Sequence, residues 1–392
     1  MKIQKTKIAL IELYGHNEVL YILFRLLKGD FEISVFTTQE IMQDAEDYFD
    51  VRLENWNSQS LSESKENFIK RHIQVLNNQD IVIFITLVSS FRFFAKTIFE
   101  AKTIFLIHNI NTMLLPEQKL WIDQSSGINF SKDCLRFLIA KIRSNGFYKK
   151  QLLDRMIYIS FPSSTLTDYA KSITNQYDDK IIESLPLSFY ESYIMENNDS
   201  IIISVPGVIL EEARDYCILY EAFKKLLVKS ERTIQLQLLG NSNNDFGKKI
   251  VSKFQQLESD NFELIFFRKQ LSQRNYDKFL RKTDFMILPI QKYRKFGIIK
   301  EEYGKSNISG GLNDIVRFGI PTLLIYSYKS ERRFKPLIST FRDKDELAIK
   351  LNDWIENSRY LEIREAAQPI LEKLNEENTR INLVKRIKKM LN

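Results

Sequence analysis

The chain has 392 residues, of which 44% are hydrophobic and 27% charged, and its formal net charge is +7. These values exclude a disordered or fibrous chain and are typical of an ordinary globular protein of two or three domains. Its two cysteines, Cys134 and Cys217, are too few for a disulfide framework or a cysteine-rich metal site. The moderate positive charge suits nucleic acid, an anionic membrane or anionic small substrates, and does not choose among them.

The sequence gives no signal for export or for a membrane span. The basic residues 1–7 are followed by a short strand pattern and polar residues, not by a signal-peptide core. The most apolar stretch, Ile81–Phe94, is interrupted by Ser89, Ser90 and Arg92 and is shorter than the roughly 20 apolar residues that a span needs. We therefore expect a cytoplasmic protein.

In the first half, short β-branched apolar runs alternate with helical patterns, as in a parallel sheet that is covered on both faces. Strands are expected at Lys7–Leu13, Glu32–Thr37, Ile81–Thr86, Thr103–His108 and Met156–Ile159. Helices are expected at Glu18–Leu27, Ser64–Leu76 and Thr165–Ile173. The short polar segment Glu191–Ser200 that follows indicates a linker.

A second series of strands and helices begins after this linker. Strands are expected at Ile201–Val205, Ile234–Leu239, Phe262–Phe267, Phe285–Leu288 and Thr322–Tyr326. Helices are expected at Tyr216–Val228, Phe246–Leu257 and Gln273–Leu280, and Asp343 to Asn392 is expected to be helical except at Pro369. The two series predict two doubly wound α/β domains with a cleft between them, and a single large sheet is the alternative.

The segment Tyr303–Thr322 is the most informative for function. A polar loop, Gly304–Gly311, leads into a short amphipathic helix that Gly319 and Pro321 stop. A glycine pair at a helix start lets phosphates approach backbone N–H groups, where the helix dipole favours negative charge. A simple strand–helix connection, in which Ser309 only caps the helix, is the alternative.

A carboxylate follows this glycine pair within the same helix. Asp314 comes four residues after Gly310, so it lies on the same side about one turn into the helix. There it could accept hydrogen bonds from the two hydroxyls of a ribose. The segment is therefore a candidate cradle for a nucleoside diphosphate.

Ordered motifs of the second half resemble the nucleotide-binding domain of glycosyltransferases with the GT-B fold. They are similar in particular to the retaining, family 4-like group of bacterial surface-polysaccharide synthesis. The motifs are Ile203-Ser-Val-Pro-Gly207, Arg214-Asp-Tyr216, Leu238-Leu-Gly240, Thr283-Asp-Phe-Met-Ile-Leu-Pro289 and Ser309-Gly-Gly-Leu-Asn-Asp314 through Gly319-Ile-Pro321. The resemblance covers about Ile201 to Leu351, whereas the first half matches mainly in its strand–helix rhythm and the placement of His16 and His108.

The resemblance implies two Rossmann-like domains that face a central cleft, with C-terminal helices. Residues 1–195 would bind the acceptor, residues 196–365 the nucleotide sugar, and residues 366–392 would form a C-terminal helical segment. The implied reaction moves a sugar from a nucleotide-diphosphate sugar to a saccharide or lipid-linked acceptor, with retention and without a metal or cofactor. The acceptors usual for the group and the positive charge suggest an anionic membrane surface as a further partner, at the inner face of the membrane.

The resemblance also assigns residues to the donor site. Donor-binding residues are expected at Gly207, Arg214, Ser309, Gly310, Gly311 and Asp314. Arg214 and Lys305 are the candidate cations for the charge that develops on the departing β-phosphate. Each cation could instead be an ordinary solvated surface residue.

Two positions depart from the family pattern. The family often has Arg directly after the glycine at Gly207, and here that residue is Val208. It also often has Glu eight residues before the ribose carboxylate, and here that residue is Ser306. These departures favour a competing function, a non-catalytic GT-B-fold binding or scaffold subunit of a glycosylation complex.

Two histidines follow predicted strands at the edge where ligands bind in open α/β sheets. His108 is a candidate catalytic residue, and His16 with Asn17 is expected on the acceptor side; a structural role stays open for each histidine. No cluster has zinc-type spacing, so no metal is expected. The sequence lacks the serine-hydrolase elbow, the P-loop, a dinucleotide fingerprint after the first strand and any nucleic-acid module, so these classes and a nucleic-acid partner are not expected.

Overall fold

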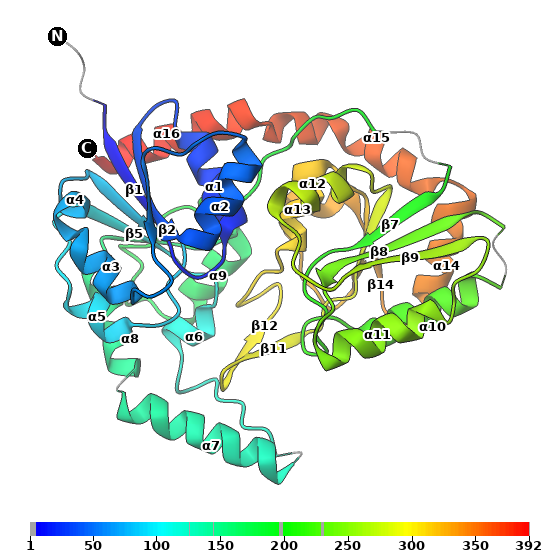
Figure 1. The fold of residues 1–392 in the computed structure, drawn as a ribbon, viewed down its shortest axis with the longest axis horizontal. Helices are drawn as coiled ribbons and strands as arrows, with labels where there is room; N and C mark the ends of the chain where they lie inside the picture. Colours follow the sequence, from blue (N-terminus) through cyan, green and yellow to red (C-terminus); the bar gives the residue numbers. More distant parts are fainter. Residues whose placement is uncertain (1–4, 125, 144, 196–198, 229–230, 392) are drawn as a thin grey trace. The chain divides into compact units, whose positions relative to one another are not determined.

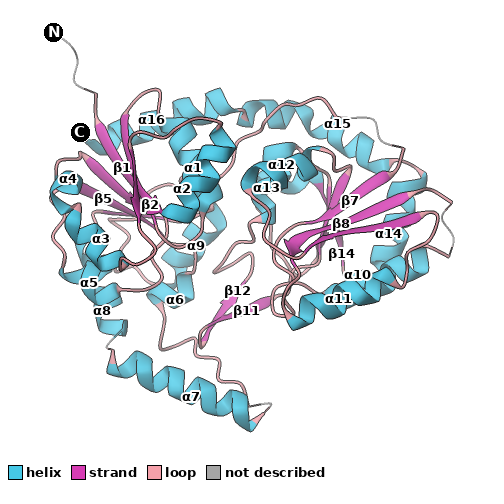
Figure 2. Ribbon diagram, viewed as in Figure 1, coloured by secondary structure: helices cyan, strands magenta, loops and turns pink. Residues whose placement is uncertain are grey.

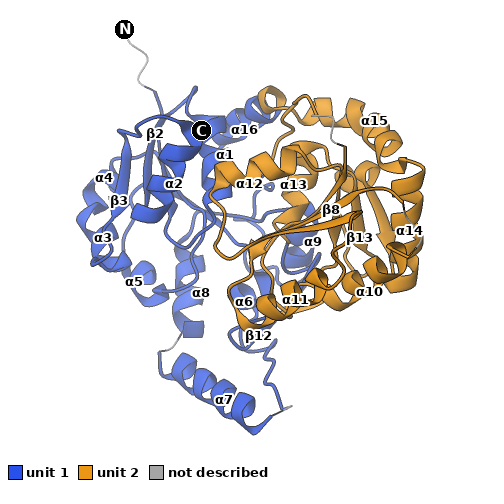
Figure 3. Cartoon of the chain, turned by 45° about the vertical axis from the view of Figure 1, so that its right-hand side comes forward, with its two compact units in different colours: residues 1–187, 295–308, 379–392 blue, residues 188–294, 309–378 orange. Residues whose placement is uncertain are grey.

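The chain folds into two compact units in a computed structural model that describes residues 5–124, 126–143, 145–195, 199–228 and 231–391 (Figure 1). The first unit comprises residues 1–187, 295–308 and 379–392, and the second comprises residues 188–294 and 309–378 (Figure 3). The predicted boundaries at 195/196 and 365/366 stay predictions. The compact units divide the chain elsewhere, because a short internal segment and the C-terminal end contact the first unit.

The first unit is built on a parallel six-stranded sheet with the order β3-β2-β1-β4-β5-β6 (Figure 2). Its strands are β1 (Lys7–Glu12), β2 (Glu32–Thr38), β3 (Trp56–Gln59), β4 (Ile81–Phe84), β5 (Lys102–Leu106) and β6 (Tyr158–Ser160). The central strands β1 and β4 are almost wholly buried, since helices cover both faces of the sheet. This explains why they appear in the sequence as continuous apolar runs.

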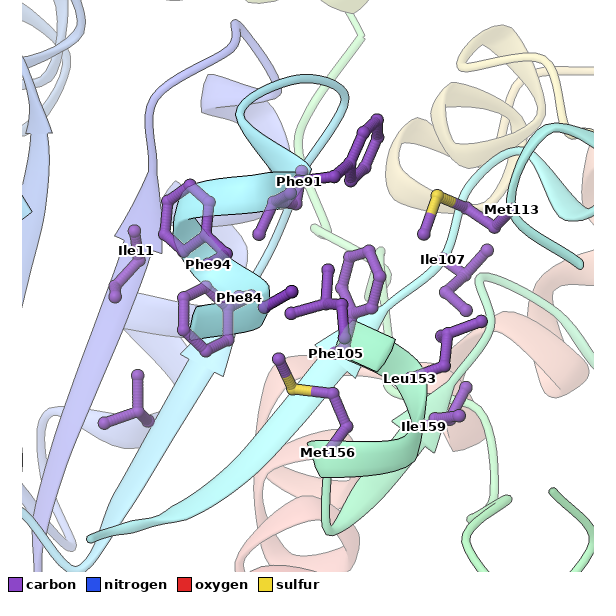
Figure 4. Packing of buried hydrophobic residues seen from close by; sticks show 14 of the residues in the cluster. Ile11, Phe84, Phe91, Phe94, Phe105, Ile107, Met113, Leu153, Met156 and Ile159 are labelled. Carbon is purple, nitrogen blue, oxygen red and sulfur yellow. The ribbon is translucent and has the colours of Figure 1, made fainter. Parts of the chain in front are cut away.

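Helices of the first unit follow its strands along the chain. They are α1 (Asn17–Leu27), α2 (Gln39–Phe49), α3 (Lys65–Arg71), α4 (Ile73–Asn77), α5 (Phe91–Lys96), α6 (Ile110–Leu114), α7 (Gly127–Ile142), α8 (Asn145–Arg155), α9 (Ser164–Ile173) and most of α16 (Glu376–Leu391). Between one face of the sheet and α5 and α8 lies an aromatic-rich core that includes Phe84, Phe94, Phe105 and Leu153 (Figure 4). This packing holds the strand ends in place.

A hairpin from the second half of the chain completes the first unit. Strands β11 (Tyr293–Phe296) and β12 (Ile299–Glu302) form a separate two-stranded sheet. Ile299 pairs with Leu120 in an antiparallel bridge, and β12 packs against α6. The sequence pattern did not predict β3, α7 or this hairpin.

The second unit has its own parallel six-stranded sheet, with the order β14-β13-β10-β7-β8-β9. Its strands are β7 (Ile201–Val205), β8 (Ile234–Asn241), β9 (Phe262–Phe267), β10 (Phe285–Leu288), β13 (Thr322–Ile325) and β14 (Ile338–Phe341). Its helices are α10 (Tyr216–Leu226), α11 (Asp245–Gln255), α12 (Gln273–Arg281), α13 (Gly311–Phe318), α14 (Lys344–Glu356) and α15 (Arg359–Leu371), with 3₁₀ turns at Arg332–Leu337 and Glu372–Leu374. Two separate sheets confirm the predicted fold class and exclude the single large sheet.

Some predicted boundaries need correction. The strand expected at Met156–Ile159 begins at Tyr158, because the amide of Met156 still bonds to the carbonyl of Leu152 in the preceding helix. The C-terminal helices do not break at Pro369, which lies within α15; Ser358, with a left-handed φ of 52°, separates α14 from α15. Residues 196–198 of the expected linker lie outside the described residues.

Candidate functional site

The candidate donor site lies at the carboxyl ends of β7 and β10 in the second unit. From β7 the chain order runs to β8 and β9 on one side, and from β10 to β13 and β14 on the other. Such a reversal is where ligands bind in open α/β sheets, because the loops after the two strands diverge and leave room between them. Pro206 and Gly207 follow β7, and Pro289 follows β10.

Glycines allow the loop after β7 to pack closely at this edge. Gly207 has a φ of 91°, a backbone conformation that residues with a Cβ rarely adopt. A Cβ on Gly240, at the end of β8, would lie 2.1 Å from the Gly207 carbonyl oxygen. A Cβ on Gly207 itself would lie 2.6 Å from the Nη2 atom of Arg214. The glycines of two family motifs are thus required by the fold of this edge.

Arg214 is a buried cation at the same edge, with only 4% of the residue exposed. Its Nη1 donates to the Ala213 carbonyl (3.1 Å), and its Nη2 donates to the Pro206 carbonyl (3.3 Å) and to the Ser309 hydroxyl (3.1 Å). All three acceptors are neutral, and no carboxylate among the described residues pairs with this guanidinium. Its Nε–H is buried without a partner.

A buried charge without a counter-charge is costly, since burial removes its water. A buried cation with only neutral partners is typical of a site that binds an anion. An arginine has five N–H donors in a planar fork, and the three used here leave Nε–H and one Nη1–H for such an anion.

The first turn of α13 supplies backbone donors beside Arg214. Gly310 is the N-cap, and the amides of Gly310 and Gly311 form no hydrogen bond in the part of the chain that the structure describes. A Cβ on Gly311 would lie 3.0 Å from a Leu288 methyl group and 3.2 Å from Pro206, so this glycine lets the helix approach β7 and β10 closely. A Cβ on Gly310 would meet no atom beyond its chain neighbours within 4 Å, and Gly310 is exposed.

Ser309 does not have the capping role that the alternative interpretation of this segment gave it. The N-cap is Gly310, and no side chain caps the helix. The Ser309 hydroxyl instead accepts a hydrogen bond from Arg214, and its backbone N–H donates to the Tyr328 hydroxyl (3.4 Å). Ser309 thus connects the arginine to the glycine pair.

Asp314 lies one turn further along α13 and is 8% exposed. Its Oδ2 accepts a hydrogen bond of 2.7 Å from the Tyr276 hydroxyl of α12. Burial, together with the charge of Asp314, raises the pKa of Tyr276 well above its usual value, so the tyrosine stays a donor. This bond fixes the orientation of the carboxylate before any ligand arrives.

Lys305 belongs to the first unit, where it makes its contacts. Its Nζ lies 5.2 Å from the ring centroid of Tyr169 and 3.6 Å from the Glu302 carboxylate. It belongs to the segment 295–308 of the first unit, whereas α13 begins at Gly311 in the second unit. A catalytic role for Lys305 stays a prediction.

Ser306, at one of the departures from the family pattern, is fully buried in the first unit. Its hydroxyl accepts from the Asn111 side chain (3.1 Å) and from the backbone N–H of Glu302 (2.8 Å). The neighbouring Glu301 carboxylate is also fully buried and accepts from the backbone N–H groups of Asn111 and Thr112, the first turn of α6. Ser306 is therefore part of the hydrogen-bond network that holds the β12 segment on α6.

The first unit has a comparable edge at the carboxyl ends of β1 and β4, where its chain order also reverses. His16 follows β1, and its ring stacks on that of His108, with centroids 4.3 Å apart. Nε2 of His108 lies 2.9 Å from the Ile85 carbonyl oxygen just after β4. The structure thus brings the two predicted histidines together.

The two rings have different electrostatic surroundings. Burial and the neighbouring His16 lower the pKa of His108 well below its usual value, so it is neutral. Burial also disfavours the charged form of His16, but the carboxylates of Glu18 and Glu12 outweigh it and raise the pKa of His16. Asn17, the other predicted acceptor-side residue, donates its amide to Asp44 (2.8 Å).

Some residues of these edges were not predicted. Tyr276 and Tyr328 orient Asp314 and Ser309, and Glu12 ends β1 in the first unit with its Oε1 bonded to the amides of Tyr14 and Gly15. A charged residue that ends an apolar strand is a signal that could have identified Glu12. No group of His, Cys, Asp or Glu within the described ranges could hold a metal ion, and no helix there is long and apolar enough to cross a membrane.

No known family model matches the chain. No curated protein matches its sequence either. Its structure, however, is similar over nearly the whole length to that of HepE from Anabaena, which was solved in complex with UDP-glucose. The TM-score is 0.63 at 12% sequence identity, and the match covers 98% of this chain and 99% of that chain.

Two further structures show the same likeness. The pneumococcal O-GlcNAc transferase GtfA, solved with UDP and GlcNAc, has a TM-score of 0.57 at 10% identity and 99% coverage of both chains. The UDP-GlcNAc 2-epimerase of Methanocaldococcus jannaschii has a TM-score of 0.54 at 8% identity, with 98% of this chain and 100% of that chain covered. The chain has a GT-B-like fold, which glycosyltransferases and epimerases that use nucleotide sugars share.

Proposed function

We propose that the protein is a glycosyltransferase that moves a sugar from a nucleotide-diphosphate sugar to a saccharide or lipid-linked acceptor. The observation that carries this proposal is the buried Arg214, whose guanidinium has only neutral acceptors and which lies with the free amides of Gly310 and Gly311 at one end of the sheet. A ligand with two adjacent phosphates fits such a set of donors. The solved relatives that carry UDP or UDP-glucose support the same ligand class.

In the proposed reaction the bond between the anomeric carbon and the β-phosphate oxygen breaks, and the acceptor oxygen forms a new bond to that carbon. The acceptor proton is released, and negative charge develops on the departing diphosphate. Arg214 and the amides at the start of α13 stabilise this charge, which is the role that a metal ion has in other transferases. Retention of the anomeric configuration is part of the proposal, by resemblance to the retaining group.

Asp314 is proposed to bind the ribose of the donor. Its carboxylate is already oriented by Tyr276, so binding costs little additional ordering of the side chain. Gly207, Ser309 and Gly311 shape the same site through close packing. His108 is proposed as a catalytic residue, and His16 and Asn17 as acceptor-side residues of the first unit, with Lys305 as a second cation.

A non-catalytic GT-B-fold scaffold is the second candidate, and Ser306 favours it. The family's Glu at this position is replaced by a residue that the first unit uses for its own hydrogen bonds. No side chain at position 306 is then available to hold a donor sugar. Val208, 44% exposed beside Gly207, likewise supplies no cation.

The test combines ligand binding with turnover. Thermal shift with UDP, GDP, CDP and CMP identifies the nucleotide, since a ligand of the folded state raises the melting temperature. The corresponding sugar nucleotides are then incubated with saccharide and lipid-linked acceptors, and the products are separated by mass spectrometry. Transfer supports the proposal, binding without transfer or hydrolysis supports the scaffold, and a changed sugar without transfer identifies an epimerase.

A further inference from the structure

Helix α7 of the first unit carries a stripe of large apolar side chains that the described chain leaves uncovered. The stripe consists of Ile128 (70% exposed), Leu135 (58%), Leu138 (55%), Ile139 (39%) and Ile142 (81%). With 3.6 residues per turn these five positions fall within an arc of about 100°. In Figures 1 and 3 the helix projects away from the sheet of its unit.

The opposite side of α7 faces its own unit. Asp133 is 2% exposed and forms an ion pair with Lys295 of the β11 strand, and it accepts from the backbone N–H of Asp123 (2.9 Å). Phe137, on the same side, is partly covered, whereas Phe130 near it on the helical wheel is 45% exposed. The helix is therefore anchored mainly through Asp133, and the apolar stripe lies on the side away from this contact.

Cations border one edge of the stripe. Lys132, Arg136 and Arg143 are exposed and fall in the next arc of roughly 40° on the helical wheel. Asp133 is the only acidic residue of α7, and it is buried and paired with Lys295 and with Arg136 (3.3 Å), so Lys132 and Arg143 are the cations on which the charge of this edge chiefly depends. The outer side of this helix therefore combines apolar bulk with positive charge and has no exposed carboxylate.

We propose that α7 docks on an anionic lipid surface, lying in the plane of the interface with its apolar stripe among the acyl chains. A helix with a wide apolar face and cations beside it binds in this way, and its depth is about 5–10 Å. The cations then lie at the level of the anionic headgroups. A second copy of this chain fits less well, because its α7 presents the same cations and no exposed carboxylate to pair with them.

The proposal deepens the proposed function, which includes a lipid-linked acceptor, by naming the surface that would contact the lipid. It rests on the proposed function only for its purpose, which is to hold the enzyme near a lipid-linked acceptor. Its test uses no sugar nucleotide, so either idea can fail while the other stands.

The experiment measures co-sedimentation of the full chain with vesicles of phosphatidylcholine alone or mixed with phosphatidylglycerol. The apolar variant combines Leu135→Gln and Ile139→Gln, and the charge variant combines Lys132→Gln and Arg143→Gln. The matched control combines Ile349→Gln on α14, where 70% of the side chain is exposed, with Leu361→Gln on α15, where 44% is exposed. All six side chains are exposed, so circular dichroism should report intact folding for every variant.

We expect wild type and the control to bind vesicles only when phosphatidylglycerol is present, and added salt to weaken binding. The charge variant should bind roughly 25-fold more weakly, at about fivefold per cation, and the apolar variant at least about tenfold more weakly. Wild type that fails to bind anionic vesicles, or α7 variants that bind as wild type does, would overturn the proposal. Light scattering supplies a third test: a wild-type dimer that the apolar variant converts to monomers, with no vesicle binding by either, would assign the stripe to a second copy.

Discussion

Replacement of Arg214 by alanine tests the donor site most directly. The change removes three hydrogen bonds, to the carbonyls of Ala213 and Pro206 and to the Ser309 hydroxyl. A buried acceptor left unpaired costs about 1–3 kcal/mol, and water that enters the vacated space restores part of this. We therefore expect the free energy of unfolding to fall by about 2–3 kcal/mol, and the protein to remain folded.

The effect on binding should depend on the phosphates. A charged hydrogen bond contributes about 1.5–3 kcal/mol, which corresponds to roughly 10- to 100-fold in affinity. Arg214→Ala should weaken nucleoside diphosphate binding by this factor and leave binding of the bare nucleoside unchanged. Isothermal titration of both ligands with both proteins gives the comparison, and turnover should fall at least as far as diphosphate affinity.

Arg364 provides a matched control for the loss of stability. Its Nη2 also donates to two backbone carbonyls, of Thr283 (3.1 Å) and Asp284 (2.9 Å), but these residues precede β10 and lie at the opposite end of the strand. Arg364→Ala should therefore destabilise the fold by a similar amount and leave nucleotide affinity intact. If folded Arg214→Ala binds the diphosphate as tightly as wild type, the assignment of the anion site to Arg214 is wrong.

Four further substitutions test other residues of the two units. Asp314→Ala should weaken binding of the nucleoside and of its diphosphate by the same factor, roughly 10-fold or more by calorimetry, because both ligands carry the ribose. Tyr276→Phe keeps the Asp314 carboxylate and should have a smaller effect. Gly310→Ala should leave the melting temperature unchanged or raise it, because no atom beyond the chain neighbours lies within 4 Å of the added Cβ. Calorimetric titration should nevertheless show weaker diphosphate binding, because the added methyl group would lie where the phosphates are proposed to approach. Burial lowers the pKa of Lys149 to about 8. Between pH 8 and 10 the unfolded chain therefore binds one more proton than the folded chain, and the stability of the wild type rises with pH by up to about 3 kcal/mol. Urea unfolding of Lys149→Met should lack this rise, and parallel pH curves for the two proteins would contradict the prediction.

The alternation of strands and helices could be predicted because it depends on local patterns. Buried parallel strands require continuous β-branched runs, and the start and stop of α13 follow from Gly311 and Gly319, which adopts a φ of 58°. The two sheets and the grouping of Gly207, Arg214 and Asp314 in the second unit follow from the same reasoning, since these residues were placed after strands or at a helix start.

Contacts between distant parts of the chain could not be predicted in this way. Tyr276 lies 38 residues before Asp314, and nothing in its helix indicates which carboxylate it meets. The hairpin segment 295–308 pairs with residues about 190 positions earlier, so a local pattern cannot assign it to the first unit. Helix α7 was not predicted, so only the structure shows its apolar stripe and that the described chain leaves this stripe uncovered.

The buried position of Ser306 explains why a glutamate does not fit there. A glutamate at this position would bury a second carboxylate next to Glu301, whose pKa is already raised by burial. Two adjacent buried carboxylates repel each other, so the network of Asn111, Glu301 and Ser306 is compatible with the small hydroxyl and not with the acid. The departure at Ser306 is thus tied to how the β12 segment is held on α6.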